Sequence, residues 1–188
     1  DIVIQTCDAL SAAHAANIVH RDIKPANLYL TYPNGEGTRP FVKVLDFGVS
    51  KFDAGSAELT DLTGEGMLIG TLAYMPPEQI QGSKSVDGRA DVYAIAVTLY
   101  TMIAGKRPFA GNSMANVALS IVVGQYEPIS SLRPDLPQGL AEVMERAMAA
   151  VLEQRTPSAQ QFADELRAFL DVPATPEDAA FAELAPFS

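Results

Sequence analysis

The stretch HRDIKPANLYL, residues 20–30, brings several chemically active side chains close together in the sequence. Asp22 is followed two residues later by Lys24 and then by Asn27, and a strand-like run starts immediately afterwards. A carboxylate accepts a proton from a hydroxyl group, an ammonium neutralises charge on a transferring phosphate, and a carboxamide oxygen binds a hard cation. These residue types at this spacing predict a phosphoryl-transfer site.

A second carboxylate, Asp46, belongs to the sequence DFG and follows another strand-like run. Residues 28–32 and 41–45 are rich in aliphatic and aromatic side chains, and the residues between them are turn formers. If the two runs pair as a hairpin, Asn27 and Asp46 lie at the same end of it. Mg²⁺ takes a few protein oxygen ligands and leaves its other positions to water and phosphate, so this pair is a candidate metal site.

Most of the remaining chain has the apolar periodicity of helices. The longest apolar run, 92–104, predicts a buried core helix, and Ser158 with Gln161 predicts a capping box before the last helix. Three further apolar stripes mark helices: Ile4, Cys7, Leu10 and Ala13; Met114, Val117, Ile121 and Val122, closed by Gly124; and Leu140, Val143, Met144, Ala147, Met148 and Val151. We therefore predict a mainly α fold, a helical bundle with one short β-hairpin, over residues 1–170. Residues 171–188 are rich in proline, alanine and acids, and predict a tail or linker.

The composition disfavours several classes of function. A formal charge of −10 argues against nucleic acid and anionic membranes as partners, because both require basic surfaces. The run 92–104 is too short to cross a bilayer, so we expect no membrane segment in this sequence and a cytoplasmic location, although segments outside it could anchor a longer protein. The single cysteine, Cys7, is expected to be a buried packing residue, and His14 a polar position on the first helix.

Three motifs occur in order along the chain: HRDIKPAN at 20–27, DFG at 46–48 and GTLAYMPPEQ at 70–79. Together they closely resemble the C-terminal lobe of protein kinases. The match extends over residues 1–170 and is most similar to bacterial serine/threonine kinases of the eukaryotic-like (Hanks) type, in which a lysine follows two residues after the aspartate. The resemblance implies ATP as phosphate donor, Mg²⁺ or Mn²⁺ as the metal, and serine or threonine hydroxyls of proteins as acceptors.

The resemblance also implies a role for each residue of the predicted site. Asp22 would be the catalytic base, and Lys24 would contact the γ-phosphate of ATP. Asn27 and Asp46 would bind the metal ions. Tyr29 would stack on the adenine, at a position where an aliphatic residue is usual.

Further contacts are implied by the resemblance alone. They include a buried ion pair of Glu78 with Arg155 and an anchor from Asp91 to the backbone of the HRD turn. Thr71 would pack against Asp22 and Lys24, and His20 and Phe47 would have packing roles. Arg21 would pair with a phosphorylated loop residue, for which Thr60 and Thr63 are candidates. Most of these contacts join residues far apart in the sequence.

The sequence lacks the parts with which protein kinases cover the nucleotide. NGEG at 34–37 and GEGMLIG at 64–70 do not match the glycine-rich loop, and no V-A-I-K-type strand follows either. We therefore expect the N-terminal lobe to be missing and the fragment alone to be inactive. Two functions stay open: the catalytic lobe of an active serine/threonine kinase, and a non-catalytic kinase-like interaction or scaffold lobe. A small-molecule phosphotransferase is disfavoured, because such enzymes are not expected to carry the segment at 70–79.

Overall fold

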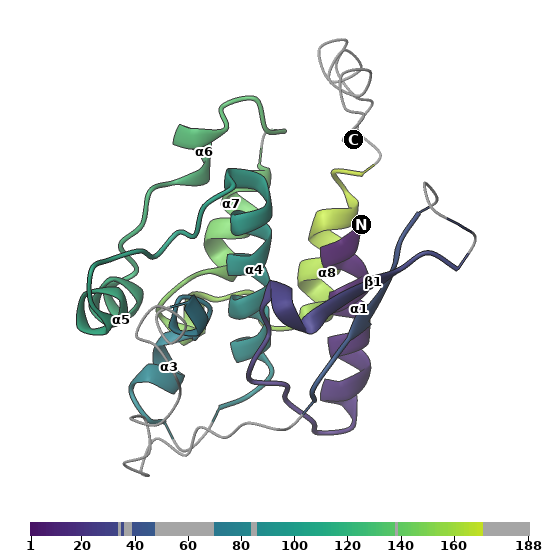
Figure 1. Cartoon of the computed structure of the whole chain (residues 1–188), viewed down its shortest axis with the longest axis horizontal. Helices are drawn as coiled ribbons and strands as arrows, with labels where there is room; N and C mark the ends of the chain where they lie inside the picture. Colours follow the sequence, from purple (N-terminus) through teal and green to yellow (C-terminus); the bar gives the residue numbers. More distant parts are fainter. Residues whose placement is uncertain (34, 36–38, 48–69, 84–85, 138, 171–188) are drawn as a thin grey trace.

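A computed structural model describes residues 1–33, 35, 39–47, 70–83, 86–137 and 139–170 (Figure 1). Its elements, in chain order, are α1 (Ile2–Ala15), η1 (Pro25–Asn27), β1 (Leu28–Thr31), β2 (Phe41–Val44), α3 (Pro77–Ile80), α4 (Arg89–Ala104), α5 (Met114–Val123), α6 (Ile129–Leu132), α7 (Leu140–Ala147), η2 (Leu152–Gln154) and α8 (Ala159–Arg167). A further helical turn covers residues 70–72. Helices dominate and the two strands form one small sheet, which agrees with the predicted mainly α fold carrying a hairpin.

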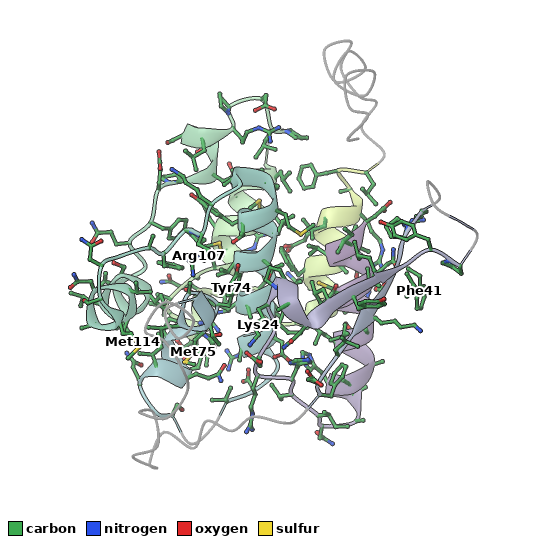
Figure 2. All side chains as sticks on the ribbon, in the orientation of Figure 1. Lys24, Phe41, Tyr74, Met75, Arg107 and Met114 are labelled. Carbon is green, nitrogen blue, oxygen red and sulfur yellow. The ribbon has the colours of Figure 1, made fainter. Side chains whose placement is uncertain are left out.

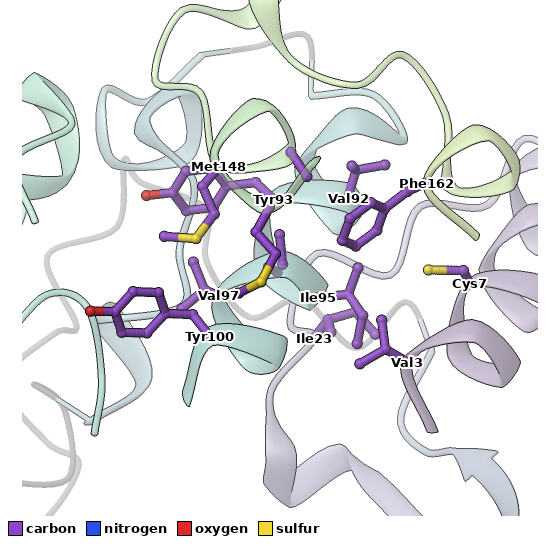
Figure 3. Close-up of a cluster of buried hydrophobic side chains, with 14 of the residues drawn as sticks. Val3, Cys7, Ile23, Val92, Tyr93, Ile95, Val97, Tyr100, Met148 and Phe162 are labelled. Carbon is purple, nitrogen blue, oxygen red and sulfur yellow. The ribbon is translucent and has the colours of Figure 1, made fainter. Parts of the chain in front are cut away.

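Helix α4 forms the centre of the helical bundle. Every side chain from residue 90 to residue 98 is buried, as expected for a helix that is apolar on all its faces. In Figure 1, α1 and α8 lie on one side of α4, and α5 and α6 lie on the other. Figure 3 shows the apolar side chains of α4 meeting Val3 and Cys7 of α1 and Phe162 of α8. The predicted core helix is confirmed, and it begins slightly earlier, at Arg89.

The hairpin packs one face on α1 and leaves the other face open. Its strands pair antiparallel with the partners Leu28–Val44, Tyr29–Lys43, Leu30–Val42 and Thr31–Phe41. Val42 is buried, and its backbone N–H donates to the side-chain oxygen of Gln5 on α1 at 3.1 Å. Side chains alternate along a strand, so Tyr29 and Phe41 point to the opposite face, where they are 58% and 54% exposed.

Helix ends follow local sequence chemistry. The hydroxyl of Ser158 accepts a hydrogen bond from the backbone N–H of Gln161 at 3.1 Å, so the predicted N-cap of α8 is confirmed. The reciprocal half of the capping box is wrong, because the Gln161 side chain bonds to Glu165 instead, at 3.0 Å. Gly124 ends α5 in the left-handed conformation, with φ of 67°, as the sequence predicted.

Two predicted core positions are wrong. Val151 is 50% exposed because α7 ends at Ala147, and the chain then leaves the helical stripe that the periodicity assigned to it. Met114 is 41% exposed at the start of α5. Cys7, by contrast, is fully buried as predicted, and this burial raises the pKa of its thiol to about 12.

Some predicted features lie outside the described residues. They are the candidate phosphorylation sites Thr60 and Thr63, Gly48 of the DFG motif, and the tail or linker at 171–188. Within the part of the chain that the structure describes, no helix combines the length and the apolar character needed to cross a membrane.

Candidate active site

Asp22, Lys24 and Asn27 lie together in one hydrogen-bonded cluster. Lys24 Nζ donates to both carboxylate oxygens of Asp22, at 3.1 and 2.9 Å. Asn27 Nδ2 donates to Asp22 Oδ2 at 3.1 Å and to the backbone carbonyl of Asp22 at 2.7 Å. The local cause is Pro25, which keeps Lys24 extended and starts the short helix η1, so that the chain turns Asn27 back toward Asp22. The Asp22 side chain is 36% exposed, so a hydroxyl group from solvent can reach it.

The hairpin brings Asn27 and Asp46 to the same end, as their positions predicted. The backbone N–H of Leu45 donates to the carbonyl of Asn27 at 2.9 Å, which continues the strand pairing by one step. Asp46 follows at once, in the left-handed conformation with φ of 62°, and is exposed. The Asn27 amide nitrogen donates to Asp22, and no hydrogen bond from another described residue uses the amide oxygen. An amide oxygen and an exposed carboxylate are the hard oxygen donors that Mg²⁺ prefers, so these residues fit the ion.

The backbone of His20–Asp22, which we call the Asp22 turn, is held by Asp91 at the start of α4. Asp91 Oδ2 accepts the N–H of His20 at 2.9 Å, and Oδ1 accepts the N–H of Arg21 at 2.8 Å. The Asp91 side chain is fully buried. A buried carboxylate must be hydrogen-bonded to be tolerated, and here its donors are the turn itself. The anchor that the family resemblance implied is therefore present.

His14 is the residue that sequence reasoning missed. We expected only a polar position on the first helix, but His14 Nε2 lies 2.7 Å from Asp91 Oδ2, 77 residues away in the sequence. The ring fits against Gly88, where an added Cβ would lie 2.6 Å from His14 Nδ1. A signal was available in the sequence: His14 continues the buried stripe through Cys7 and Leu10 at helical spacing.

His20 links the Asp22 turn to the strand that leads to Asp46. Its Nε2 lies 2.8 Å from the carbonyl oxygen of Leu45, and the N–H of Asp22 donates to its Nδ1 at 3.3 Å. An acceptor role for Nδ1 requires that Nε2 carry the proton and donate to Leu45. The ring also meets Phe47 edge-on, with centroids 4.8 Å apart, so the packing contact implied for these two residues is present.

Glu78 and Arg155 form the buried ion pair that the resemblance implied. Arg155 donates to the two carboxylate oxygens of Glu78 at 2.7 and 3.0 Å, and its own side chain is fully buried. Its remaining donors reach the carbonyls of Ala149 and Arg89, and its guanidinium lies 4.9 Å from the ring centroid of Tyr93. The pair therefore fixes the segment around α3 onto the helical bundle.

Comparison with known proteins identifies this architecture. The sequence profile of the protein kinase domain matches residues 1–170. The chain belongs to the protein kinase domain family. Serine/threonine-protein kinase Pkn1 of Myxococcus xanthus is 42% identical over 170 residues, which is 90% of this chain and 24% of that protein. Tyrosine-protein kinase MasK of the same species is 43% identical over 159 residues, 85% of this chain and 23% of that protein.

A mycobacterial relative extends the comparison. Serine/threonine-protein kinase PknA of Mycobacterium tuberculosis is 38% identical over 168 residues, 89% of this chain and 36% of that protein. The chain thus spans between 23% and 36% of the length of these three relatives. The similarity covers the helical bundle and the hairpin with its polar cluster.

Three other residues to which the resemblance gave roles, Tyr29, Thr71 and Arg21, are exposed or only half-buried. Tyr29 lies on β1 beside the polar cluster, with its ring open to solvent. Thr71 is half-buried in the helical turn before α3, and its expected packing against Asp22 and Lys24 stays a prediction. Arg21 has φ of 65° and is exposed, so an anion can reach its side chain. In Figure 2, Lys24 is labelled near the middle of the view and Phe41 on the hairpin at the right.

Proposed function

We propose that this chain is the catalytic, C-terminal lobe of a serine/threonine protein kinase that transfers the γ-phosphoryl group of ATP to hydroxyl groups of proteins. The observation that carries the proposal is the cluster in which Lys24 and Asn27 both donate to the Asp22 carboxylate. A carboxylate fixed by two donors, yet open to solvent, suits the acceptance of a hydroxyl proton. The bacterial kinases at about 40% identity support the same activity.

Each residue of the cluster has a distinct task in this reaction. Asp22 accepts the proton that leaves the substrate hydroxyl and orients the oxygen for attack. The positive charge of Lys24 neutralises negative charge on the phosphoryl group during transfer. Asn27 holds the Asp22 carboxylate in place. Tyr29 offers an exposed aromatic face on which the adenine ring can stack.

Asn27 and Asp46 would hold the metal ion in this site. Mg²⁺ or Mn²⁺ supplies neutralisation of phosphate charge when bound. Within the described residues, no group of three or more histidine, cysteine, aspartate or glutamate side chains could hold a metal by itself. Two protein ligands, completed by phosphate oxygens and water, match the way Mg²⁺ binds in such sites. The ATP requirement favours a cytoplasmic location.

Phosphorylation of matched peptides tests the proposal. Full-length protein is incubated with ATP, Mg²⁺ and three peptides that differ only in a serine, threonine or tyrosine at the acceptor position. Serine and threonine peptides should be modified and the tyrosine peptide should not, because Lys24 stands where serine/threonine kinases carry it. The tyrosine arm matters because one relative is named as a tyrosine-protein kinase. Asp22→Asn is the matched inactive control.

The 188 residues alone should bind ATP weakly and show no kinase-like turnover. Positioning supplies most of the catalysis in phosphoryl transfer, and this sequence contains no glycine-rich loop or strand lysine to clamp the phosphates. We propose that an N-terminal lobe provides them. Robust phosphorylation by the 188-residue chain would contradict this, and a full-length protein that binds partners without any transfer would favour the alternative, a non-catalytic kinase-like scaffold lobe.

A further inference from the structure

Gln79 connects the segment around α3 with the Asp22 turn. It is the residue directly after Glu78 and lies within the short helix α3. Its side-chain Nε2 donates to the backbone carbonyl of Arg21 at 3.2 Å, across 58 residues of sequence. No sequence pattern points to this contact, because it depends on how α3 packs beside the turn.

The peptide group that Gln79 contacts is the one that leads into Asp22. The carbonyl of Arg21 and the N–H of Asp22 are the two polar ends of this peptide. Gln79 Nε2 holds the oxygen, and the N–H donates to His20 Nδ1 at 3.3 Å. The preceding peptide is held as well, since Asp91 Oδ1 accepts the N–H of Arg21 at 2.8 Å. Both peptide planes that meet at Arg21 are thus fixed by side chains.

This fixation matters because Arg21 has φ of 65°. A non-glycine residue in the left-handed region is disfavoured, and surrounding contacts must stabilise the conformation. Relaxation of Arg21 toward an ordinary conformation would rotate the following peptide. Since the Cα of Asp22 is attached to that peptide, the direction of its carboxylate would change.

The Gln79 amide is oriented with its nitrogen toward the Arg21 carbonyl. Gln79 Oε1 is buried and has no hydrogen-bond partner within the described part of the chain. Turning the amide over would expose its oxygen to the Arg21 carbonyl, and two acceptors would face each other. The backbone under Gln79 is also rigid, because its neighbour Glu78 is held by Arg155 through two hydrogen bonds.

We propose that Gln79 is a positioning residue for phosphoryl transfer, which holds the Arg21–Asp22 peptide so that the Asp22 carboxylate faces the substrate hydroxyl. The inference rests on the proposed kinase function of Asp22. In this role Gln79 connects the α3 segment, held by the pair of Glu78 and Arg155, to the Asp22 turn.

Three substitutions in the full-length protein separate this role from a general effect on folding. Gln79→Leu has similar size and no donor, Gln79→Glu places an acceptor against the Arg21 carbonyl, and Gln79→Lys retains an N–H donor. Gln81, two residues later and exposed, offers the matched controls Gln81→Leu and Gln81→Glu. We measure kcat, KM for ATP and the thermal midpoint for each variant.

The expected pattern is specific. Gln79→Leu should lower kcat by about fivefold to tenfold and leave KM for ATP within about twofold of wild type. The turn loses one hydrogen bond, and the net free energy of one hydrogen bond corresponds to a rate change of about this size. Gln79→Glu should lower kcat further, Gln79→Lys should restore most of it, and both Gln81 variants should match wild type. A lower thermal midpoint with unchanged kcat in Gln79→Leu would mean that the residue is merely structural and would overturn the proposal.

A second readout does not depend on activity. Amide hydrogen exchange followed by NMR should show faster exchange of the Asp22 N–H in Gln79→Leu than in wild type or Gln81→Leu. Unchanged exchange at Asp22 would refute the positioning role, whatever the kinetics. If wild type transfers no phosphate, the proposed function fails, and the exchange experiment still decides whether Gln79 fixes the turn.

Discussion

Two ion pairs in this protein each join a cation to both oxygens of a carboxylate, but they differ in how far they are buried. Arg155 donates twice to Glu78, and Lys24 donates twice to Asp22. The side chains of the first pair are 0% and 12% exposed, whereas those of the second are 21% and 36% exposed. The pair of Arg155 and Glu78, which we call the sealed pair, is shielded from water and suits a structural role, whereas the pair of Lys24 and Asp22, the open pair, can still be reached from solvent.

Breaking the sealed pair should give the largest loss of stability. Glu78→Ala or Arg155→Ala should each lower the free energy of unfolding by about 3–5 kcal/mol, because the remaining charge is left buried without its partner. The double variant should lose less than the sum of the two single losses, since it strands no charge. Urea denaturation of the three variants measures these values. Additive losses would show that the two residues do not depend on each other.

A smaller effect is expected at the contact between α1 and α4. His14→Ala removes a hydrogen bond to the fully buried Asp91 carboxylate and should lower the free energy of unfolding by about 1.5–3 kcal/mol. Gly88→Ala should also destabilise, since its Cβ would lie 2.6 Å from the His14 ring and displace it. Gly88 has an ordinary φ of −59°, so the backbone accepts alanine.

The two substitutions at this contact should depend on each other. In the His14→Ala background the ring is gone, and Gly88→Ala should then be neutral or stabilising by about 0.4–1 kcal/mol, because alanine restricts the unfolded chain more than glycine does. Thermal unfolding of the four proteins in this cycle gives the result. A Gly88→Ala loss that is equally large in both backgrounds would mean that the histidine ring is not what the methyl group meets.

Breaking the open pair of Asp22 and Lys24 should change stability little and activity strongly. Asp22→Asn should alter the free energy of unfolding by less than about 1 kcal/mol, the range of partly exposed ion pairs. Its kcat in the full-length protein should fall roughly 10²–10⁴-fold, because the proton acceptor is lost. Thermal melts and phosphorylation assays on the same preparations separate the two quantities. A collapsed fold from Asp22→Asn would contradict the division between the sealed and open pairs.

The ion pair of Asp87 and Arg89, on the surface, should contribute least to stability. Arg89 holds the carboxylate of Asp87 through a fork of hydrogen bonds between 2.8 and 3.1 Å, yet Asp87 is 54% exposed. The hydrogen bonds from Arg89 lower the pKa of Asp87 below its ordinary value of 3.8. Because the pKa of Asp87 is lower in the folded than in the unfolded chain, this pair stabilises the fold at pH values above the unfolded-state pKa. The contribution is lost as the pH falls through the folded-state pKa.

Asp87→Asn should therefore lower the free energy of unfolding by at most about 1 kcal/mol at pH 7, and by less in acid. Urea midpoints measured at pH 7 and near pH 3 check both statements. A loss as large as that of Glu78→Ala would show that burial is not what separates the strong pair from the weak one.

The sequence determined those features that local chemistry controls. The spacing from Asp22 to Asn27 with Pro25 between them folds the cluster onto itself within a few residues, and Ser158 caps α8 through a neighbouring N–H. The two short apolar runs also predicted a hairpin, so Asn27 and Asp46 could be placed at one end of it, although the register itself was not predicted. The pairing of Glu78 with Arg155 could be expected only through the resemblance to protein kinases.

Which distant side chains support the site depends on how the helices and the hairpin pack together. His14 reaches Asp91 across 77 residues and Gln79 reaches Arg21 across 58. The helical spacing indicated that His14 lies on the buried face, but no local pattern predicted the partner of either residue. The exposure of Val151 was likewise decided by where α7 ends, not by the apolar period that included this residue. The physical reason is that a periodic pattern tells which face of a helix is buried, whereas hydrogen bonds between elements depend on how those faces are packed together.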